Sequence, residues 1–340
     1  MSDSTVDAPL VAIVTPVFNG GKYLVETMEC VQALSYPNLV HLVHDNCSAD
    51  DTASIIDQFR GRRVPVVSKR SAMVVPMAQN WNAAVRAIPE EAAYFWLLCA
   101  DDLLVPDAIE KAVRVAEGDA TVNVVGCRWT GDSLCGTELA VDKSVFDGKE
   151  VMRKYLRRET MVLSGMNVLY RVRGLDRPSE FYDGTFASFD ADATLRMLLY
   201  GNYGFVHEEL LFWRQHPDST WSTFGSKHLD YAADWLILLD RYGPYVLGHR
   251  EYLSCRRAYR NYLIRRLLVS RWRHGNLEEY SSCMNELDAH DDHVGALDFV
   301  GAIVDWGSYA IRGRRDEIGS PRRRPAAVKG GGVVVRRSRI

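Results

Sequence analysis

Residues 94–106 read YFWLLCADDLLVP, an apolar run of strand length that ends in two adjacent carboxylates. Two carboxylates at the end of a buried strand repel each other and lose hydration. A ligand that offsets this cost is therefore expected, either a divalent cation or a hydroxylated and phosphorylated molecule. Pro106 is expected to open a helix, where its missing N–H costs nothing. The alternative is that Asp101 or Asp102 only caps this helix, for which one carboxylate suffices.

Strand-like and helix-like segments alternate on both sides of this stretch. Apolar runs predict strands at residues 10–18, 39–43, 64–67, 94–98 and 122–126. The segments between them predict helices at residues 22–34, 48–59, 77–88 and 106–116. The second helix starts with a capping-box spacing, Ser48-Ala49-Asp50-Asp51. The alternation is typical of βαβ units and predicts an α/β fold, with a mostly parallel, Rossmann-like sheet flanked by helices.

Polar side chains follow the predicted strands where each one ends. Asn19, Asp45, Asp101 and Asp102 all lie at or just past a strand end. Ligands of such sheets bind outside the carboxyl ends of the strands, so a binding site is expected there. No GxGxxG follows a strand, and the chain has no P-loop, GxSxG or HExxH motif. These absences exclude several common nucleotide and hydrolase sites and favour a nucleotide site built on carboxylates.

The pattern changes after about residue 127. Short strands are expected at residues 163–170 and 210–213 with a helix at 191–200, and the chain is mostly helical after Trp221. The predicted parts are a disordered N-terminus, a sheet domain, a C-terminal helical appendage and a basic disordered tail, at residues 1–9, 10–222, 223–311 and 312–340.

The composition of the 340 residues is that of a globular protein, with 47% hydrophobic and 25% charged residues. The seven cysteines are scattered and form no CxxC pair, which indicates reduced thiols rather than a disulfide framework or a zinc site. The first nine residues lack the order of a signal peptide, and no apolar run reaches the length of about 18 residues that a membrane span needs. A cytoplasmic protein is expected, at most peripheral to the inner face of a membrane.

Basic residues gather near the C-terminal end of the sequence. Residues 312–340 contain ten lysines and arginines against two acidic residues, although the whole chain carries a net charge of −3. Residues 256–273 alternate arginines with an apolar stripe that includes Tyr259, Leu263 and Leu267. Such a helix either lies on an anionic membrane or packs its stripe on the sheet domain, and packing is favoured. No nucleic-acid partner is expected, and nothing in the sequence indicates an oligomeric state.

Six segments together resemble the inverting GT-A glycosyltransferases of family two, over residues 10–222. These segments are Val11–Gly20, His44–Thr52, Gln79–Asn82, Cys99–Asp102, Phe189–Gly201 and Phe212–Thr220. The resemblance implies a GT-A-like fold and a nucleotide-sugar donor. Cys99 stands where the family's metal motif often has an acid, and Phe189 stands where a glutamate is usual.

The resemblance also implies which residues bind the nucleotide and a divalent cation, Mn²⁺ or Mg²⁺. Asp45 would accept a hydrogen bond from the ring N–H of the nucleobase, and Asp101 would contact the ribose. Asp102 would ligate the metal, although the two roles could be exchanged, with His216 as a further ligand. The remaining residues implied to contact the nucleotide are Pro16, Phe18, Asn19, Asn82 and Arg214.

Asp190 falls on the position of the family's catalytic base, at the expected start of a helix. A base must take the proton of the acceptor hydroxyl as its oxygen attacks the anomeric carbon. The helix dipole would favour the ionised carboxylate. Asp192 is the second candidate for the base, and the alternative is that Asp190 or Asp192 only caps the helix.

The expected function is transfer of a sugar, with inversion, from a nucleotide-sugar to an acceptor hydroxyl. A UDP-sugar is the default donor, and the acceptor is expected to be a glycan or a lipid-linked molecule in polysaccharide or glycoconjugate biosynthesis. Two alternatives stay open: a sugar nucleotidyltransferase, and a non-catalytic nucleotide-sugar-binding protein that kept the fold.

Overall fold

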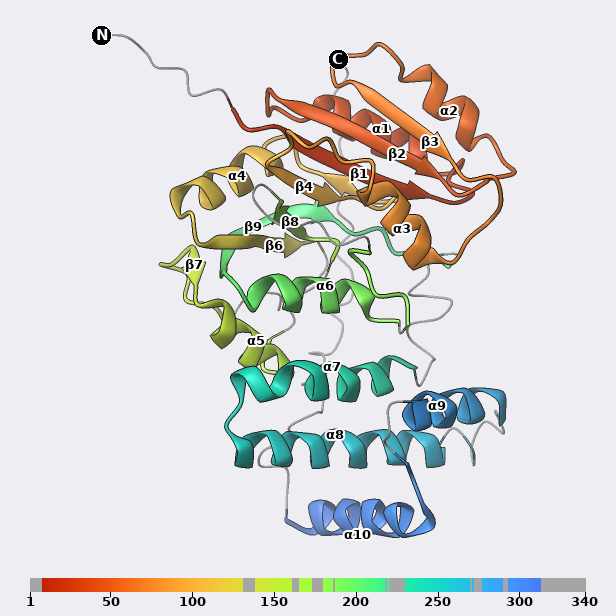
Figure 1. The fold of residues 1–340 in the computed structure, drawn as a ribbon, viewed down its shortest axis with the longest axis vertical. Coiled ribbons are helices and arrows are strands. Elements are labelled where there is room, and N and C mark those ends of the chain that lie inside the picture. Colours follow the sequence, from red (N-terminus) through yellow and green to blue (C-terminus); the bar gives the residue numbers. More distant parts are fainter. Residues whose placement is uncertain are drawn as a thin grey trace, which may run out of the picture.

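The computed structural model describes residues 8–130, 138–160, 165–172, 180–185, 187–217, 219, 230–269, 271, 277–289 and 293–312. Most of the predicted disordered N-terminus, the boundary at residues 222 and 223, and the tail after residue 312 lie outside these residues, so those predictions remain untested. The described chain forms an α/β fold with one mixed sheet and helices on its faces (Figure 1).

The first half of the sheet is parallel, as the alternation predicts. Its strands lie in the order β3-β2-β1-β4. They are β1 (Val11–Val17), β2 (Leu39–Asp45), β3 (Val66–Arg70) and β4 (Tyr94–Leu97). The connecting helices are α1 (Leu24–Ala33), α2 (Thr52–Gln58) and α3 (Met77–Val85). Every residue of β1, β2 and β4 is buried, which explains their nearly continuous apolar sequences.

The second half of the sheet mixes strand directions. Strand β8 (Val168–Arg171) lies antiparallel between β4 and β6 (Val122–Trp129), while β9 (Asn202–Phe212) runs parallel to β6. Two short strands that the sequence pattern did not predict, β5 (Leu103–Leu104) and β7 (Val145–Phe146), pair with β9. The β5–β9 pairing places the segment just after the acidic pair against the strand that leads to Arg214.

The turn between the acidic pair and the next helix corrects the helix-cap interpretation. Helix α4 (Ala108–Gly118) begins two residues after Pro106, and its N-cap residue, Asp107, makes no side-chain capping bond. Just before the helix, Val105 N–H donates to the Leu210 carbonyl, which extends the β5 pairing. Asp101 and Asp102 therefore do not cap this helix.

The later helices stack below the sheet (Figure 1). They are α5 (Gly148–Leu156), α6 (Phe189–Leu198), α7 (Asp230–Val246), α8 (His249–Val269), α9 (Leu277–Ala289) and α10 (Ala296–Arg312). Residues of β4, α6, α7 and α8 share one hydrophobic core. The apolar stripe of α8 belongs to it, with Tyr259, Leu263 and Leu267 buried, so this stripe packs inward instead of facing a membrane. None of the described helices is long and apolar enough to cross a membrane.

Candidate active site

The loops after β1 and β2 are bonded to each other at the carboxyl edge of the sheet. Asn19 N–H donates to Ser48 Oγ (2.8 Å), and Ala49 N–H donates to Asn19 Oδ1 (2.9 Å). Gly21 N–H donates to Asp50 Oδ2 (2.8 Å) in the same way. The predicted capping box is therefore wrong: Ser48 and Asp50 bind the neighbouring loop, and α2 begins at Thr52 without a side-chain bond from its N-cap residue.

Asp45 ends β2 and is held from two sides. Its Oδ1 accepts the Ser48 N–H (2.9 Å), and its Oδ2 accepts from Arg70 (2.5 Å), which ends β3. Arg70 also donates to the Ser48 carbonyl (2.7 Å). Each carboxylate oxygen has two lone pairs, so Asp45 can accept a further bond. Arg70 was not anticipated as a site residue, although its place at the end of the third strand was the available signal.

Pro16, Phe18 and Asn82, which were also predicted to contact the nucleotide, differ in burial and in their hydrogen bonds. Pro16 is buried within β1, and Phe18, two residues later, is about half exposed. Asn82 is buried in α3, where its Nδ2 donates to the Tyr182 carbonyl (2.7 Å) and its Oδ1 accepts the Tyr182 N–H (2.8 Å). Because the main chain of Tyr182 occupies both ends of this amide, Asn82 fixes the segment before α6, and its contact with a nucleotide stays a prediction.

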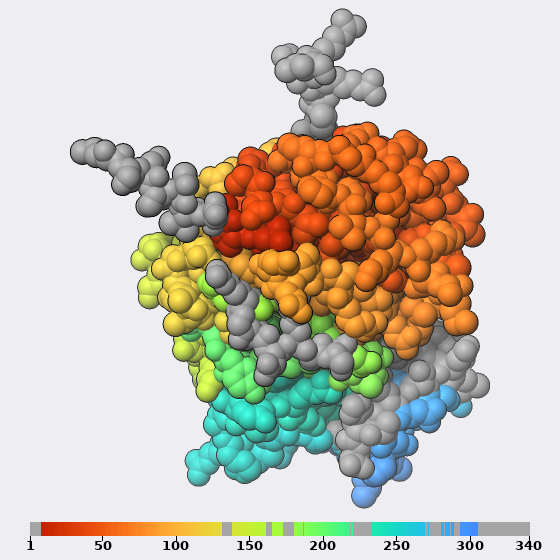
Figure 2. Space-filling model, turned by 45° about the horizontal axis from the view of Figure 1, so that its top comes forward, coloured from red at the N-terminus to blue at the C-terminus, as the bar shows by residue number. Residues whose placement is uncertain are grey.

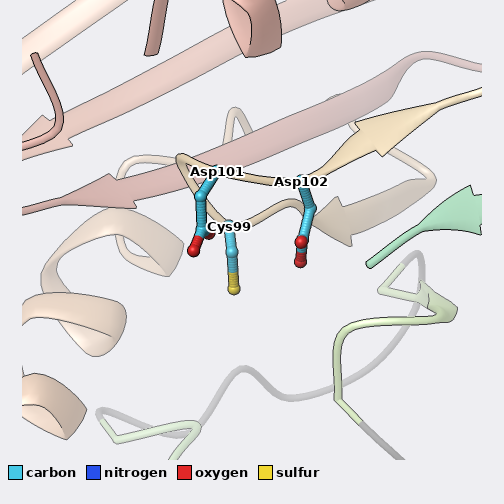
Figure 3. Close-up of side chains that lie close together, drawn as sticks. All are labelled: Cys99, Asp101 and Asp102. Atoms are coloured by element: carbon cyan, nitrogen blue, oxygen red, sulfur yellow. The ribbon is translucent and has the colours of Figure 1, made fainter. Parts of the chain in front are cut away.

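Cys99, Asp101 and Asp102 gather on the loop after β4. Their sulfur and carboxylate oxygen atoms lie within 4.8 Å of one another, and Figure 3 shows the three side chains extending from the loop in the same direction. Thr27 of α1 holds this loop from behind, since its hydroxyl lies 3.0 Å from the carbonyls of both Ala100 and Asp102. Helix α1 therefore supports the loop that carries Asp101 and Asp102.

The cluster is electrostatically costly when no cation is bound. Burial, reinforced by the charge of Asp101, raises the pKa of Asp102 to about 7, although the Arg214 N–H that it accepts opposes this shift. Burial and the charges of Asp102, Asp101 and Asp190 raise the pKa of the Cys99 thiol well above its ordinary value. A positive ion between these groups would relieve both effects.

Two residues after β9 complete the cluster. Arg214 N–H donates to Asp102 Oδ1 (2.9 Å), while its guanidinium donates to the Asp101 carbonyl and to Glu26 (both 2.8 Å). His216 Nε2 lies 2.9 Å from Asp101 Oδ2. The structure therefore brings together four predicted site residues that lie in two distant parts of the sequence.

The donor atoms suit a divalent cation. Carboxylates are common ligands of Mn²⁺ and Mg²⁺, whereas an imidazole or a thiolate adds affinity for softer ions such as Zn²⁺. His216 Nδ1 is buried and has no hydrogen-bond partner within the described part of the chain. Such an atom points to a group that the protein itself does not supply.

Asp190 lies in the first turn of α6, as predicted. Its Oδ2 accepts the Gly165 N–H (3.1 Å), and its Oδ1 accepts the Ala191 N–H (2.8 Å). Burial raises the pKa of this carboxyl, while the two N–H donors oppose the shift. Gly165 is needed for the close approach, because a Cβ added there would stand 2.5 Å from Asp190 Cβ. The negative charge of Asp190 contributes to the raised pKa of Cys99, so Asp190 interacts electrostatically with the acidic cluster.

Asp192, the second candidate for the base, is fully buried. Its Oδ1 accepts from Arg241 and from the Tyr242 hydroxyl (both 2.7 Å), two residues of α7. Another α7 residue, Asp234, accepts the N–H of Ser188 at the start of α6 (2.5 Å). Helix α7 therefore holds α6, the helix that carries Asp190, in place. This arrangement was not foreseen, because α7 is far away in sequence.

Comparisons with known proteins point to a glycosyltransferase. Residues 12–177 match the profile of the family described as "Glycosyl transferase family 2". Glycosyltransferase GlyG of Streptococcus pneumoniae serotype 4 is 24% identical over 237 residues, which cover 63% of this chain and 73% of GlyG. The putative teichuronic acid biosynthesis glycosyltransferase TuaG of Bacillus subtilis is 31% identical over 108 residues, or 31% of this chain and 41% of TuaG.

Solved structures share the fold. S. aureus TarS 1-349, crystallised in complex with UDP-GlcNAc, has a TM-score of 0.57 and 14% identity, and the match covers 86% of this chain and 81% of the TarS 1-349 chain. The mannosyltransferase PcManGT from Pyrobaculum calidifontis, in complex with GDP-Man and Mn²⁺, has a TM-score of 0.53 and 14% identity, with coverage of 90% and 81%. At such low identity the likeness shows the fold alone.

Proposed function

Because residues 12–177 match the model of glycosyl transferase family 2 and the fold is that of GT-A glycosyltransferases, we propose that the chain belongs to this family and transfers a sugar from a nucleotide-sugar to an acceptor hydroxyl, with inversion and with the help of a divalent cation. The observation that carries this proposal is the cluster at the end of β4, where His216 meets Asp101 beside Asp102. UDP-GlcNAc and GDP-Man in the TarS and PcManGT structures support a nucleotide-sugar donor, and a UDP-sugar is the default.

The assignment of roles within the acidic pair follows their exposure. Asp101 is the more accessible carboxylate and is the partner of His216, so these two residues would hold the cation. Asp102 is 1% exposed and accepts the Arg214 N–H, so it would hold the loop and add negative charge behind the ion. This division gives Asp101 the metal-binding role that the resemblance implies for Asp102, and it assigns the ribose contact to neither carboxylate. The bound cation would neutralise charge on the leaving diphosphate.

The nucleotide would lie along the carboxyl edge. Asp45 would accept the ring N–H of the nucleobase, with Arg70 holding the carboxylate in place. Asn19 would shape the first loop through its bonds to Ser48 and Ala49, with a backbone φ of 50° that asparagine tolerates better than most residues. Phe18, half exposed beside this loop, is available to a base or ribose.

Asp190 would act as the base for the acceptor hydroxyl. Its two N–H donors fix the carboxylate, and its raised pKa makes it a stronger base than an ordinary aspartate. The hydroxyl oxygen would attack the anomeric carbon as its proton moves to Asp190, and the nucleoside diphosphate would leave from the opposite face. The acceptor is proposed to be a glycan or a lipid-linked molecule, acted on at the cytoplasmic side of a membrane.

The test is nucleoside diphosphate release from a panel of UDP-, GDP- and dTDP-sugars with Mn²⁺, compared between the wild type and Asp190→Asn. The variant should bind the nucleoside diphosphate with wild-type affinity. It should produce the diphosphate from the nucleotide-sugar at least about 100-fold more slowly than the wild type. Asp107→Asn, at an exposed ion pair on α4, is the control. Pyrophosphate release from a nucleoside triphosphate would instead favour a nucleotidyltransferase. Binding without turnover of any donor would favour a non-catalytic protein.

A further inference from the structure

Tyr23 lies next to the two residues that connect the end of β9 to the acidic cluster. It is the N-cap residue of α1 and is partly exposed. The centre of its ring lies 4.7 Å from the centre of the His216 imidazole, and the two ring planes are inclined at 45°. The Arg214 guanidinium lies over the same tyrosine ring, also 4.7 Å from its centre. One aromatic ring therefore contacts two side chains that come much later in the sequence.

Both of these neighbours bind Asp101. His216 Nε2 lies 2.9 Å from Asp101 Oδ2, and the Arg214 guanidinium donates to the Asp101 carbonyl (2.8 Å). The ring of a histidine rotates over a broad range of angles, so a hydrogen bond through one nitrogen does not fix the plane of the imidazole. Contact with the Tyr23 ring restricts this rotation. The orientation of the groups around Asp101 therefore depends on Tyr23.

Two further residues at the start of α1 contact the same cluster. Glu26 accepts from the Arg214 guanidinium (2.8 Å), and the Thr27 hydroxyl lies 3.0 Å from two carbonyls of the loop after β4. Residues three and four positions apart lie on the same side of a helix, so Tyr23, Glu26 and Thr27 form one surface. That surface contacts both parts of the cluster, the loop after β4 and the segment after β9.

The turn before α1 fixes the place of Tyr23. The Tyr23 N–H donates to the Gly20 carbonyl (3.0 Å), and the Gly20 N–H donates to Thr52 Oγ1 (2.9 Å). A larger residue at Gly20 would displace this turn, because its Cβ would stand 2.5 Å from Val17 Cγ2. Figure 2 shows the red and orange part of the chain, to which α1 belongs, above the green segments from later in the chain. Tyr23 connects these two parts at the acidic cluster.

We propose that Tyr23 is a positioning residue, whose ring holds the imidazole and the guanidinium that bind Asp101 and so orients the cation site. The inference rests on the proposed function, because it takes Asp101 and His216 as ligands of the cation. Residues that hold metal ligands in place commonly contribute about 10- to 100-fold to metal affinity. Both contacts of Tyr23 are made by its ring, so the ring and not the hydroxyl supplies the effect.

The experiment is a calorimetric measurement of Mn²⁺ affinity in the full chain and its variants. Tyr23→Leu should bind Mn²⁺ about tenfold more weakly than the wild type. Tyr23→Phe, which keeps the ring, should bind it within about twofold of the wild type. Tyr245→Leu, at a tyrosine that is 65% exposed on α7, is the control and should leave the affinity unchanged. Circular dichroism should show that Tyr23→Leu is folded, and Tyr23→Met repeats the comparison with a second non-aromatic side chain.

A double-mutant cycle separates positioning from a general structural role. If Tyr23 acts through His216, adding Tyr23→Leu to His216→Ala should lower the Mn²⁺ affinity by less than about threefold, instead of about tenfold. Equal affinity in Tyr23→Leu and the wild type, or an undiminished effect in the His216→Ala background, would overturn the positioning role alone. Wild-type affinity in His216→Ala by itself would overturn the cation site, and the inference with it, so the two failures are distinguishable.

Discussion

His216 Nε2 lies 2.9 Å from Asp101 Oδ2, although the two residues are 115 positions apart in the sequence. Removing the imidazole takes away a proposed ligand of the cation and the hydrogen-bond partner of the Asp101 carboxylate. His216→Ala should weaken Mn²⁺ binding about 10- to 100-fold, measured by calorimetry. His249→Ala, at the exposed start of α8, should leave the affinity unchanged. Equal Mn²⁺ affinity in the wild type and His216→Ala would remove His216 from the site.

Gly165 permits the close approach of Asp190. An alanine Cβ would stand 2.5 Å from Asp190 Cβ, so Asp190 must move away. Gly165→Ala should therefore lower turnover at least about tenfold while nucleoside diphosphate affinity is kept, because a small displacement of a catalytic group is costly. Gly118→Ala is the matched control, since its added Cβ meets nothing within 4 Å. Wild-type turnover in Gly165→Ala would argue against Asp190 as the base.

Asp192 should matter for stability and not for proton transfer. Asp192→Asn breaks its buried ion pair with Arg241 but leaves an acceptor for the Tyr242 hydroxyl. We expect a loss of about 1–3 kcal/mol in the free energy of unfolding, measured with urea. Turnover per folded molecule should remain within about threefold of the wild type, far above that of Asp190→Asn. The reverse ranking of the two variants would make Asp192 the base.

Because it is buried and neutral, His41 is expected to lower the free energy of unfolding in mild acid. It is fully buried in β2 beside Thr15, and burial lowers its pKa to about 3. The unfolded chain takes up this proton near pH 6.5, so stability is full above that pH and falls as the pH drops toward 3. Between pH 7.5 and 5.5, His41 alone should lower the free energy of unfolding by about 1.4 kcal/mol. The raised pKa of Asp102 acts in the opposite direction over this range, so the measured quantity is the difference between the wild type and His41→Gln. An identical pH dependence in the wild type and the variant would contradict the assignment.

The parallel half of the fold could be predicted because its signals are local. Buried strands such as β1 and β4 read as continuous apolar runs, and polar residues mark their ends. Strand β5 has only two residues and exists through its pairing with β9, so no local pattern announces it. The case of α5 is different: Asp147 caps it by accepting the Glu150 N–H, a signature that the sequence does contain.

Some residues of the candidate site could likewise be predicted from local sequence signals, and others could not. Asp45 and the acidic pair follow strands, so their common edge could be inferred. The burial of Asp192 could not, because it depends on Arg241, which is 49 positions away on another helix. Ser48 shows how a local pattern misleads: it has capping-box spacing, but the loop after β1 offers its hydroxyl a better partner in the Asn19 N–H.

The most direct test is the affinity of the wild type for UDP, GDP and dTDP, measured by calorimetry with Mn²⁺ and again with EDTA. A cation held by Asp101 and His216 should tighten binding of one diphosphate at least about tenfold over binding in EDTA. Asp101→Asn should abolish this gain while keeping the weak metal-free binding. Equal affinity with Mn²⁺ and EDTA, or an undiminished gain in Asp101→Asn, would contradict the cation-dependent site proposed at the end of β4.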